Sequence, residues 1–214
     1  MEALSSLLQH ARRPEEVLHE RGYRYIAGVD EAGRGPLAGP VVAAAVIFPC
    51  DWTHPDIKDS KQLTAQKREY LFGIVSQEAL AWNWAEVGHA EIDTINILQA
   101  SLKAMQCAVE LLSLPPDYLL IDGTYPITSP IPQTPLVKGD QRSLATAAAS
   151  IMAKVIRDSI MKQYHELYPQ YNFAKNKGYG TKEHLQALAY YGPSPIHRKS
   201  FNAGKHYLPL LEPR

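Results

Sequence analysis

The sequence predicts one α/β domain whose last helices gather in a C-terminal lobe. Two segments rich in β-forming residues open the domain, at residues 23–30 and 41–48. Strand-like and helix-like segments then alternate as far as about residue 168, and only helix-like and irregular segments follow. This order is typical of a single α/β domain. A chain of 214 residues with 45% apolar residues is long enough to bury the core that such a domain needs.

The first 22 residues predict a short helical appendage. Leu4, Leu7 and Leu8 have helical spacing, Pro14 suits the first turn of a second helix, and Gly22 suits its end. We therefore divide the chain into the appendage, residues 1–22, and a main domain, residues 23–214, and we assign no chemistry to the appendage.

The remaining elements follow from periodicity and capping residues. Strands alternate or are continuously apolar, helices repeat apolar residues at steps of three and four, and Ser60 or Thr64 is expected to cap the first long helix. We expect strands at 81–87, 118–122 and 134–137, and helices at about 64–78, 90–112, 143–168 and 181–191.

Cysteine usage and hydropathy predict a cytoplasmic protein. Cys50 and Cys107 form no C-x-x-C pair, so neither a zinc site nor a disulfide framework is expected. The longest strongly apolar run, residues 41–48, is too short to cross a membrane, and the N-terminus does not resemble a signal peptide.

The net charge is zero, but it is divided unevenly along the chain. Residues 1–137 hold 10 Lys and Arg against 17 Asp and Glu, whereas residues 138–214 hold 12 against 5. The two parts therefore carry −7 and +7. The basic part can attract a phosphate backbone, so overall neutrality does not exclude a nucleic-acid partner.

Four acids stand where predicted strands end. Asp30 and Glu31 follow the first strand, Asp122 follows the apolar run at 118–121, and Asp140 follows the segment ending at Gly139. Each one alone is more often a turn former or a helix cap, and Asp140 could cap the long helix. Together, carboxylates without nearby lysines would repel one another unless a cation neutralised them. A set of oxygen ligands favours Mg²⁺ or Mn²⁺, and paired metals of this kind cleave phosphodiesters.

The segment next to the first acids is more specific. Gly33, Arg34 and Gly35 directly follow the acidic pair. Glycines allow a close backbone approach to a ligand, and an arginine between them offers a forked donor to phosphate. A tight turn is the alternative interpretation, but the adjacent acids and the length of the pattern favour a binding loop.

With these residues the chain resembles bacterial type 2 ribonuclease H (ribonuclease HII). Eight motifs occur in family order over residues 25–201: Asp30-Glu-Ala-Gly-Arg-Gly-Pro, Asp59-Ser-Lys-Gln-Leu, Glu91-Ile-Asp-Thr-Ile-Asn-Ile-Leu, Leu120-Ile-Asp-Gly, Lys138-Gly-Asp140, Ala147-Ala-Ala-Ser-Ile-Met-Ala-Lys-Val-Ile-Arg-Asp158, Lys177-Gly-Tyr-Gly-Thr181 and His197-Arg-Lys-Ser-Phe201. One departure is Asn176, where relatives commonly have histidine.

The resemblance implies a ribonuclease H-like mixed sheet flanked by helices, with the main domain as the catalytic domain. It implies an endonuclease that hydrolyses the RNA strand of RNA–DNA hybrids and nicks duplex DNA 5′ of single embedded ribonucleotides, leaving a 3′-hydroxyl and a 5′-phosphate. Asp30, Glu31, Asp122 and Asp140 would then bind the metal, Mg²⁺ or Mn²⁺. These are the four acids already selected from the strand ends.

The resemblance also implies how the substrate is held. Gly33, Arg34 and Gly35 would read the 2′-hydroxyl with main-chain groups, and Tyr179 would lie against the sugar of the next deoxynucleotide. Further candidate phosphate contacts are Ser60, Lys61, Ser150 and Lys154. Packing is the alternative for Tyr179 and a solvated side chain the alternative for Lys61. Arg157 and Asp158 are expected to pair with each other.

Alternative functions are a type 3 ribonuclease H and a catalytically inert hybrid-binding module. Type 3 enzymes carry an additional N-terminal domain, and an inert module would not keep four carboxylates. We expect a monomer that acts on RNA–DNA hybrids and ribonucleotide-containing DNA, with no membrane partner. The tail, residues 206–214, has some likeness to a peptide that binds a replication clamp.

Overall fold

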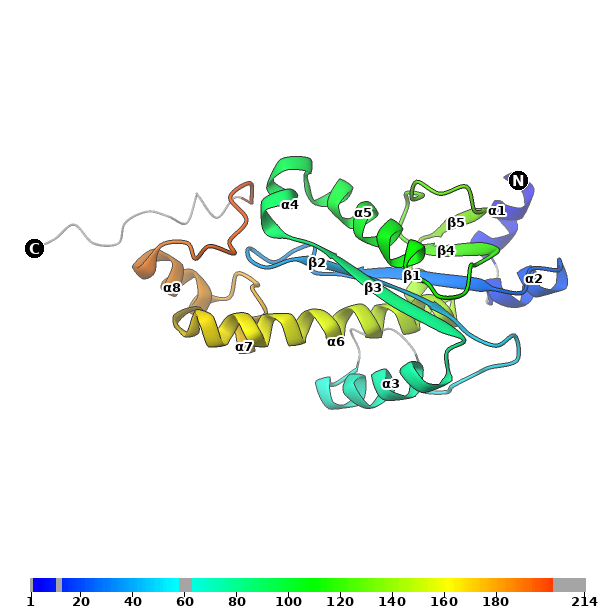
Figure 1. The fold of residues 1–214 in the computed structure, drawn as a ribbon, viewed down its shortest axis with the longest axis horizontal. Helices are drawn as coiled ribbons and strands as arrows, with labels where there is room; N and C mark the ends of the chain where they lie inside the picture. The colour runs from blue at the N-terminus through cyan, green and yellow to red at the C-terminus, as the bar shows by residue number, and fades with distance from the viewer. Residues whose placement is uncertain (1, 11–12, 58–62, 202–214) are drawn as a thin grey trace, which may run out of the picture.

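The computed structural model describes residues 2–10, 13–57 and 63–201, and in them five strands form one mixed sheet in the order β3–β2–β1–β4–β5 (Figure 1). The strands are β1 (Ile26–Ala32), β2 (Val41–Ile47), β3 (Ala81–Val87), β4 (Tyr118–Asp122) and β5 (Gln133–Leu136). β2 is antiparallel to both of its neighbours, whereas β1, β4 and β5 run parallel. The carboxyl ends of three adjacent strands therefore meet at one edge of the sheet.

Helices cover both faces of this sheet (Figure 1). α5 packs on one face, and α6 with α3 packs on the other. The helices are α1 (Glu2–His10), α2 (Pro14–Glu20), α3 (Ala65–Glu78), α4 (His89–Ile95), α5 (Ile97–Glu110), α6 (Leu144–Leu167), α7 (Phe173–Asn176) and α8 (Lys182–Tyr191), with short 3₁₀ turns η2 (Gly139–Gln141) and η3 (Pro169–Tyr171). The predicted ribonuclease H-like mixed sheet flanked by helices is confirmed.

The apolar strand β2 shows why the sheet needs two helical layers. Every residue of β2 is buried, and successive side chains point to opposite faces. Val41, Ala43 and Ala45 pack with α5, whereas Val42 and Ala44 pack with α3 and α6. The three consecutive alanines of this strand leave room for helices on either side.

The strand β1 and the helix α6 approach each other very closely at Gly28. A Cβ atom at this position would lie 2.1 Å from the carbonyl carbon of Ala145 and 2.2 Å from the amide nitrogen of Thr146. Main chain meets main chain here, so only glycine fits. The contact sets the height of α6 above the strand that carries Asp30.

The prediction of one helix over residues 90–112 is wrong, because the chain forms two helices there. Asn96 separates α4 from α5 with a φ of +68°. Its side-chain Oδ1 accepts hydrogen bonds from the amides of Leu98 and Gln99 at 3.0 and 3.1 Å, and so caps α5. The apolar periodicity continues across the break, which is why the pattern alone does not reveal it.

Side-chain caps also begin α3 and α6, and of these only Thr64 is predicted from the sequence. Thr64 caps α3 by accepting from the amide of Lys67, and Ser143 caps α6 by accepting from the amide of Thr146. The interpretation of Asp140 as the cap of this helix is wrong, because Ser143 caps α6 and Asp140 lies before it in η2.

The helices at both ends of the described chain pack against the central domain. Leu8 of α1 and Leu18 of α2 are buried with Leu120 of β4 and Leu136 of β5. At the other end, η3, α7 and α8 form the predicted helical C-terminal lobe around Phe173. No helix within the described ranges is long and apolar enough to cross a membrane.

Candidate active site

The parallel strands bring the four predicted acids to one edge of the sheet. Val29 of β1 pairs with Ile121 of β4, so Asp30 and Asp122 are the next residues along neighbouring strands. The loop after β5 returns to the same place, where the amide of Gly139 donates to Asp122 Oδ1 at 2.7 Å. Asp140 follows in η2 and is buried. The topology thus explains why these residues, distant in sequence, gather.

Burial and mutual repulsion disfavour negative charge at Asp30 and Glu31. The pKa of Asp30 is raised well above its ordinary value by burial, then by the charges of Glu31 and Asp122, although a hydrogen bond from Ser150 opposes the rise. Burial also raises the pKa of Glu31, while Arg34 lowers it by donating from Nη1 to Glu31 Oε1 at 3.2 Å. Three carboxyl groups therefore interact directly through their charges.

The oxygens of this cluster are incompletely satisfied. Glu31 Oε2 is buried and has no hydrogen-bond partner within the described chain. As the side chains stand, no three His, Cys, Asp or Glu residues among those described converge closely enough to hold a metal ion. A cation bound here would have to draw the carboxylates of Asp30, Glu31, Asp122 and Asp140 together.

The glycine loop lies beside Tyr179. Gly33 has a φ of +101°, a conformation that favours glycine. A Cβ atom at Gly35 would lie 3.6 Å from Cε1 of Tyr179, and the amide of Leu37 donates to the carbonyl of Gly178 at 2.8 Å. The Tyr179 side chain remains 44% exposed. Two motifs from opposite ends of the domain thus form one exposed surface next to the acids.

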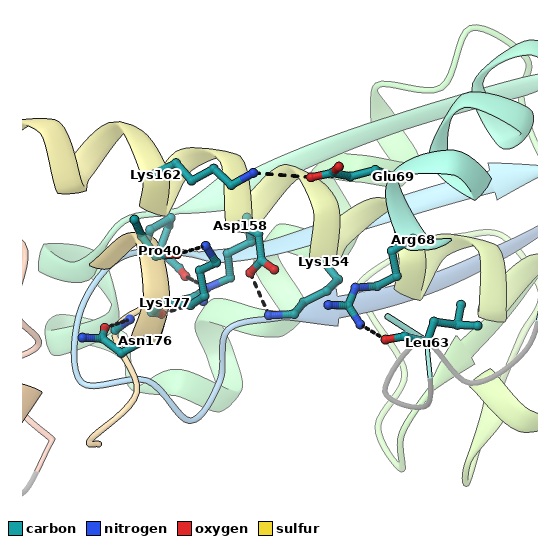
Figure 2. A network of polar contacts seen from close by, with 12 residues as sticks. Pro40, Leu63, Arg68, Glu69, Lys154, Asp158, Lys162, Asn176 and Lys177 are labelled. Atoms are coloured by element: carbon teal, nitrogen blue, oxygen red, sulfur yellow. Dashed lines mark hydrogen bonds and ion pairs between the residues drawn. The ribbon is translucent and has the colours of Figure 1, made fainter. Parts of the chain in front are cut away.

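The predicted phosphate contacts lie in different surroundings. Ser150 is buried and hydrogen-bonds to Asp30. Lys154, one turn further along α6, forms an ion pair with Asp158 at 2.7 Å (Figure 2). Asp158 thus pairs with Lys154 and not, as expected, with Arg157. Ser60 and Lys61 lie outside the described residues.

The sequence did not reveal the roles of three residues around the site. Arg157 and Arg198 are fully buried and donate to main-chain carbonyls of the segment that contains the glycine loop. Ser101 of α5 lines a hollow of about 230 Å³ together with Glu31 and Asp122, and its buried hydroxyl has no partner among the described residues. Both arginines lie in motifs that carry the resemblance, the ones ending at Asp158 and Phe201, but neither motif indicates which main-chain groups the arginines contact. A serine on a helix gives no sequence signal of such a role.

Comparison with known proteins decides the family. The model of the family described as Ribonuclease HII matches residues 27–203. The chain belongs to the ribonuclease HII family. It is therefore an endonuclease that hydrolyses the phosphodiester bonds of RNA. Type 3 ribonuclease H and an inert binding module are not favoured.

Named relatives agree over most of the chain. The Ribonuclease HII of Caldanaerobacter subterraneus subsp. tengcongensis is 56% identical over 187 residues, covering 87% of this chain and 78% of the relative. That of Geobacter sulfurreducens is 51% identical and covers 95% of this chain and 96% of the relative. The crystal structure of ribonuclease H2 from Pyrococcus horikoshii OT3 superimposes with a TM-score of 0.71 at 27% identity, covering 86% of this chain and 97% of that one.

Proposed function

We propose that this ribonuclease HII hydrolyses the RNA strand of RNA–DNA hybrids and nicks duplex DNA 5′ of single embedded ribonucleotides. The products are a 3′-hydroxyl and a 5′-phosphate. The observation that carries the proposal is the position of the glycine loop and Tyr179, which together lie directly beside the acids at the end of β1. Residues suited to sugar recognition, in the glycine loop and at Tyr179, thus lie next to an acid cluster suited to phosphodiester cleavage.

A divalent cation, Mg²⁺ or Mn²⁺, fits the chemistry of the acid cluster. Asp30, Glu31, Asp122 and Asp140 offer only oxygen ligands, which hard divalent cations prefer. The unpartnered Glu31 Oε2 and the raised pKa of Asp30 both indicate that the negative charge of this cluster is incompletely compensated. Bound there, the cation would polarise the attacking water and stabilise charge on the leaving oxygen.

Recognition of the ribonucleotide requires groups that distinguish a 2′-hydroxyl from hydrogen. Gly33, Arg34 and Gly35 offer main-chain donors and acceptors to that hydroxyl. Tyr179, exposed beside Gly35, can lie against the next sugar. In this arrangement Ser150 orients Asp30 from the buried side, while Lys154 approaches the phosphate backbone.

The acids are tested by cleavage of a duplex that contains one ribonucleotide, in Mg²⁺, in Mn²⁺ and in chelator. We expect Asp30→Asn and Asp140→Asn to lose at least about a hundredfold in rate, since each removes several kcal/mol of charge stabilisation. Glu166→Gln, which changes an exposed acid of α6, is the matched control and should cleave normally. Full activity of both aspartate variants, or cleavage in chelator, would refute the proposed mechanism.

Tyr179 is tested separately from metal binding. Tyr179→Ala should lower incision at a lone ribonucleotide about tenfold or more, because an aromatic contact of this kind contributes roughly 1–3 kcal/mol. Its affinity for Mn²⁺, measured by calorimetry, should not change. Tyr190→Ala, which removes an exposed tyrosine of α8, serves as the control. Unchanged incision by Tyr179→Ala would leave Tyr179 a packing residue only.

The uneven charge of the chain predicts salt-sensitive substrate binding. Residues 138–214 carry the net charge of +7, so their lysines and arginines supply most of the attraction to the backbone. An affinity independent of salt would contradict this division. A monomeric state, a cytoplasmic location and clamp binding by the tail stay predictions, and residues 202–214 lie outside the described chain.

A further inference from the structure

Two arginines are the largest fully buried side chains among the described residues. Arg157 of α6 is 0% exposed, and Arg198, which follows α8, is 1% exposed. In the described part of the chain neither guanidinium forms an ion pair with a carboxylate. Their hydrogen bonds go instead to main-chain carbonyl oxygens.

Each nitrogen of the Arg198 guanidinium donates to a different carbonyl of the loop after β1. Nη2 donates to Gly33 at 2.6 Å, Nη1 to Arg34 at 3.0 Å and Nε to Gly39 at 2.9 Å. The glycine loop is thus held from its buried side by the planar fork of a single side chain. Only arginine offers donors in this arrangement.

Arg157 holds the next part of the same segment. Its Nη2 donates to Ala38 at 3.2 Å, its Nε to Pro40 at 2.9 Å and its Nη1 to Lys177 at 3.0 Å. Figure 2 shows Pro40 and Lys177 close together beside α6. The Lys177 bond ties the segment to the motif that carries Tyr179. A Cβ atom at Gly33 would lie 2.1 Å from Arg157 Nε, so the loop rests directly on this guanidinium.

Such burial is costly, which argues against simple packing. Burial lowers the pKa of Arg157 to about 10 and that of Arg198 to about 9. Apolar side chains of similar volume would fill the space without desolvating a charge. The hydrogen-bond pattern, which meets five carbonyls between Gly33 and Pro40, indicates that the orientation of this segment is what the arginines provide.

The orientation has a consequence for the amides of the glycine loop. In a trans peptide the C=O and N–H groups point in opposite directions, and no described peptide bond is cis. Because the carbonyls of Gly33 and Arg34 face the buried Arg198, the N–H groups of Arg34 and Gly35 face away from it. Neither amide donates to an acceptor within the described residues. Both donors are therefore free to meet a ligand.

We propose that Arg198, supported by Arg157, is a positioning residue that aims the Arg34 and Gly35 amides at the ribose 2′-hydroxyl. This inference rests on the proposed function, since it assigns the discrimination between ribose and deoxyribose to the loop. Arg198 itself does not touch the substrate. Its effect is to fix two peptide planes before the substrate arrives, so that binding does not have to order them.

The test separates recognition of the 2′-hydroxyl from affinity for the backbone. KM and kcat are measured for a duplex with one ribonucleotide, and the all-DNA duplex of the same sequence is measured as a competitive inhibitor. For Arg198→Lys, which keeps a charge but loses the planar fork, we expect KM to rise about tenfold or more, the loss typical of a misplaced hydrogen bond. The inhibition constant of the all-DNA duplex should stay within about twofold of wild type, because exposed phosphate contacts are unaltered.

Arg142→Lys is the matched control, because Arg142 also donates to a main-chain carbonyl, that of Leu8, but outside this loop. Arg142→Lys should keep the wild-type ratio of KM for the ribonucleotide duplex to the inhibition constant of the all-DNA duplex, even where it lowers stability. If Arg198→Lys changes KM and the inhibition constant equally, or changes neither, the proposal is overturned. Wild-type protein that does not incise the ribonucleotide duplex would instead overturn the proposed function.

A measurement on the wild-type protein keeps the inference testable if Arg198→Lys does not fold. The Nε protons of Arg198 and Arg157 should exchange slowly with solvent. The amide resonances of Arg34 and Gly35 should shift with the ribonucleotide duplex and much less with the all-DNA duplex. Rapid Nε exchange, or equal shifts with both duplexes, would refute the positioning role.

Discussion

Replacing Gly28 by alanine is expected to destabilise the fold more than its single added methyl group suggests. The new Cβ would lie 2.1 Å from the carbonyl carbon of Ala145, 2.6 Å from its oxygen and 2.2 Å from the amide nitrogen of Thr146. An ordinary contact begins near 3.4 Å, so β1 and α6 would have to separate by about 1.3 Å. All three neighbours are main-chain atoms, and no side chain can rotate away.

The magnitude follows from the packing that this separation disturbs. Overpacking a well-packed core costs roughly 1–3 kcal/mol, and more where the surroundings cannot relax. Here two layers must part along a contact formed largely by alanines, so we expect a loss of about 3 kcal/mol or more in the free energy of unfolding. That is a large share of the roughly 5–15 kcal/mol that stabilises a typical domain.

Urea unfolding of the wild type, Gly28→Ala and Gly73→Ala measures the effect. Gly73 lies in α3 with nothing within 4 Å of the added Cβ. Gly73→Ala should therefore raise stability by up to about 1 kcal/mol through helix propensity. A Gly28→Ala variant within about 0.5 kcal/mol of wild type, a change typical of surface substitutions, would refute the close-contact argument. So would an equal loss in Gly73→Ala.

Three further predictions concern stability. Asn96→Ala should lose about 2 kcal/mol in the free energy of unfolding in urea, because it removes the cap of α5 and leaves alanine at positive φ. Asn96→Gly should lose less, since glycine adopts positive φ without strain. Equal losses in the two variants would contradict the contribution of backbone strain. Burial, and then His184, lower the pKa of His197 to about 4, so the unfolded chain takes up its proton first on acidification. Stability should fall by up to about 2 kcal/mol from pH 7 to pH 5, and His197→Asn should show a smaller slope; an identical slope would refute this. Glu15 accepts hydrogen bonds from the Ser143 hydroxyl and the Ala145 amide at the start of α6, so Glu15→Ala should cost about 1–2 kcal/mol of stability in thermal unfolding. Glu16→Ala, which breaks an exposed ion pair, should cost little. Equal losses in the two variants would refute the role of Glu15.

Local patterns predicted most of the elements, because their causes lie within a few residues. Thr64, one of the two caps predicted for α3, accepts a hydrogen bond from an amide three positions ahead. The strand at 134–137 is found at 133–136, within the usual uncertainty of a boundary. The break at Asn96 was missed because apolar spacing on both sides of it is continuous, and only the backbone conformation shows that the helix ends.

The acid cluster could be predicted from the sequence because its members lie at the ends of predicted strands. Asp30 and Asp122 follow apolar strands, and the parallel pairing of these strands makes them neighbours. The ion-pair partners of charged residues could not be predicted in the same way. Asp158 has Arg157 beside it in sequence but pairs with Lys154, since one helical turn brings that residue onto the same face.

The sequence by itself determined the fold class, most of the helices and strands, the acids at the strand ends and the family to which the chain belongs. Only the tertiary structure decided what holds the glycine loop in place. Arg198 donates a hydrogen bond to the main-chain carbonyl of Gly33, although the two residues are 165 positions apart in the sequence. Such a contact depends on how distant segments pack, and its acceptor is a carbonyl group that every residue type carries. No local pattern can therefore reveal it.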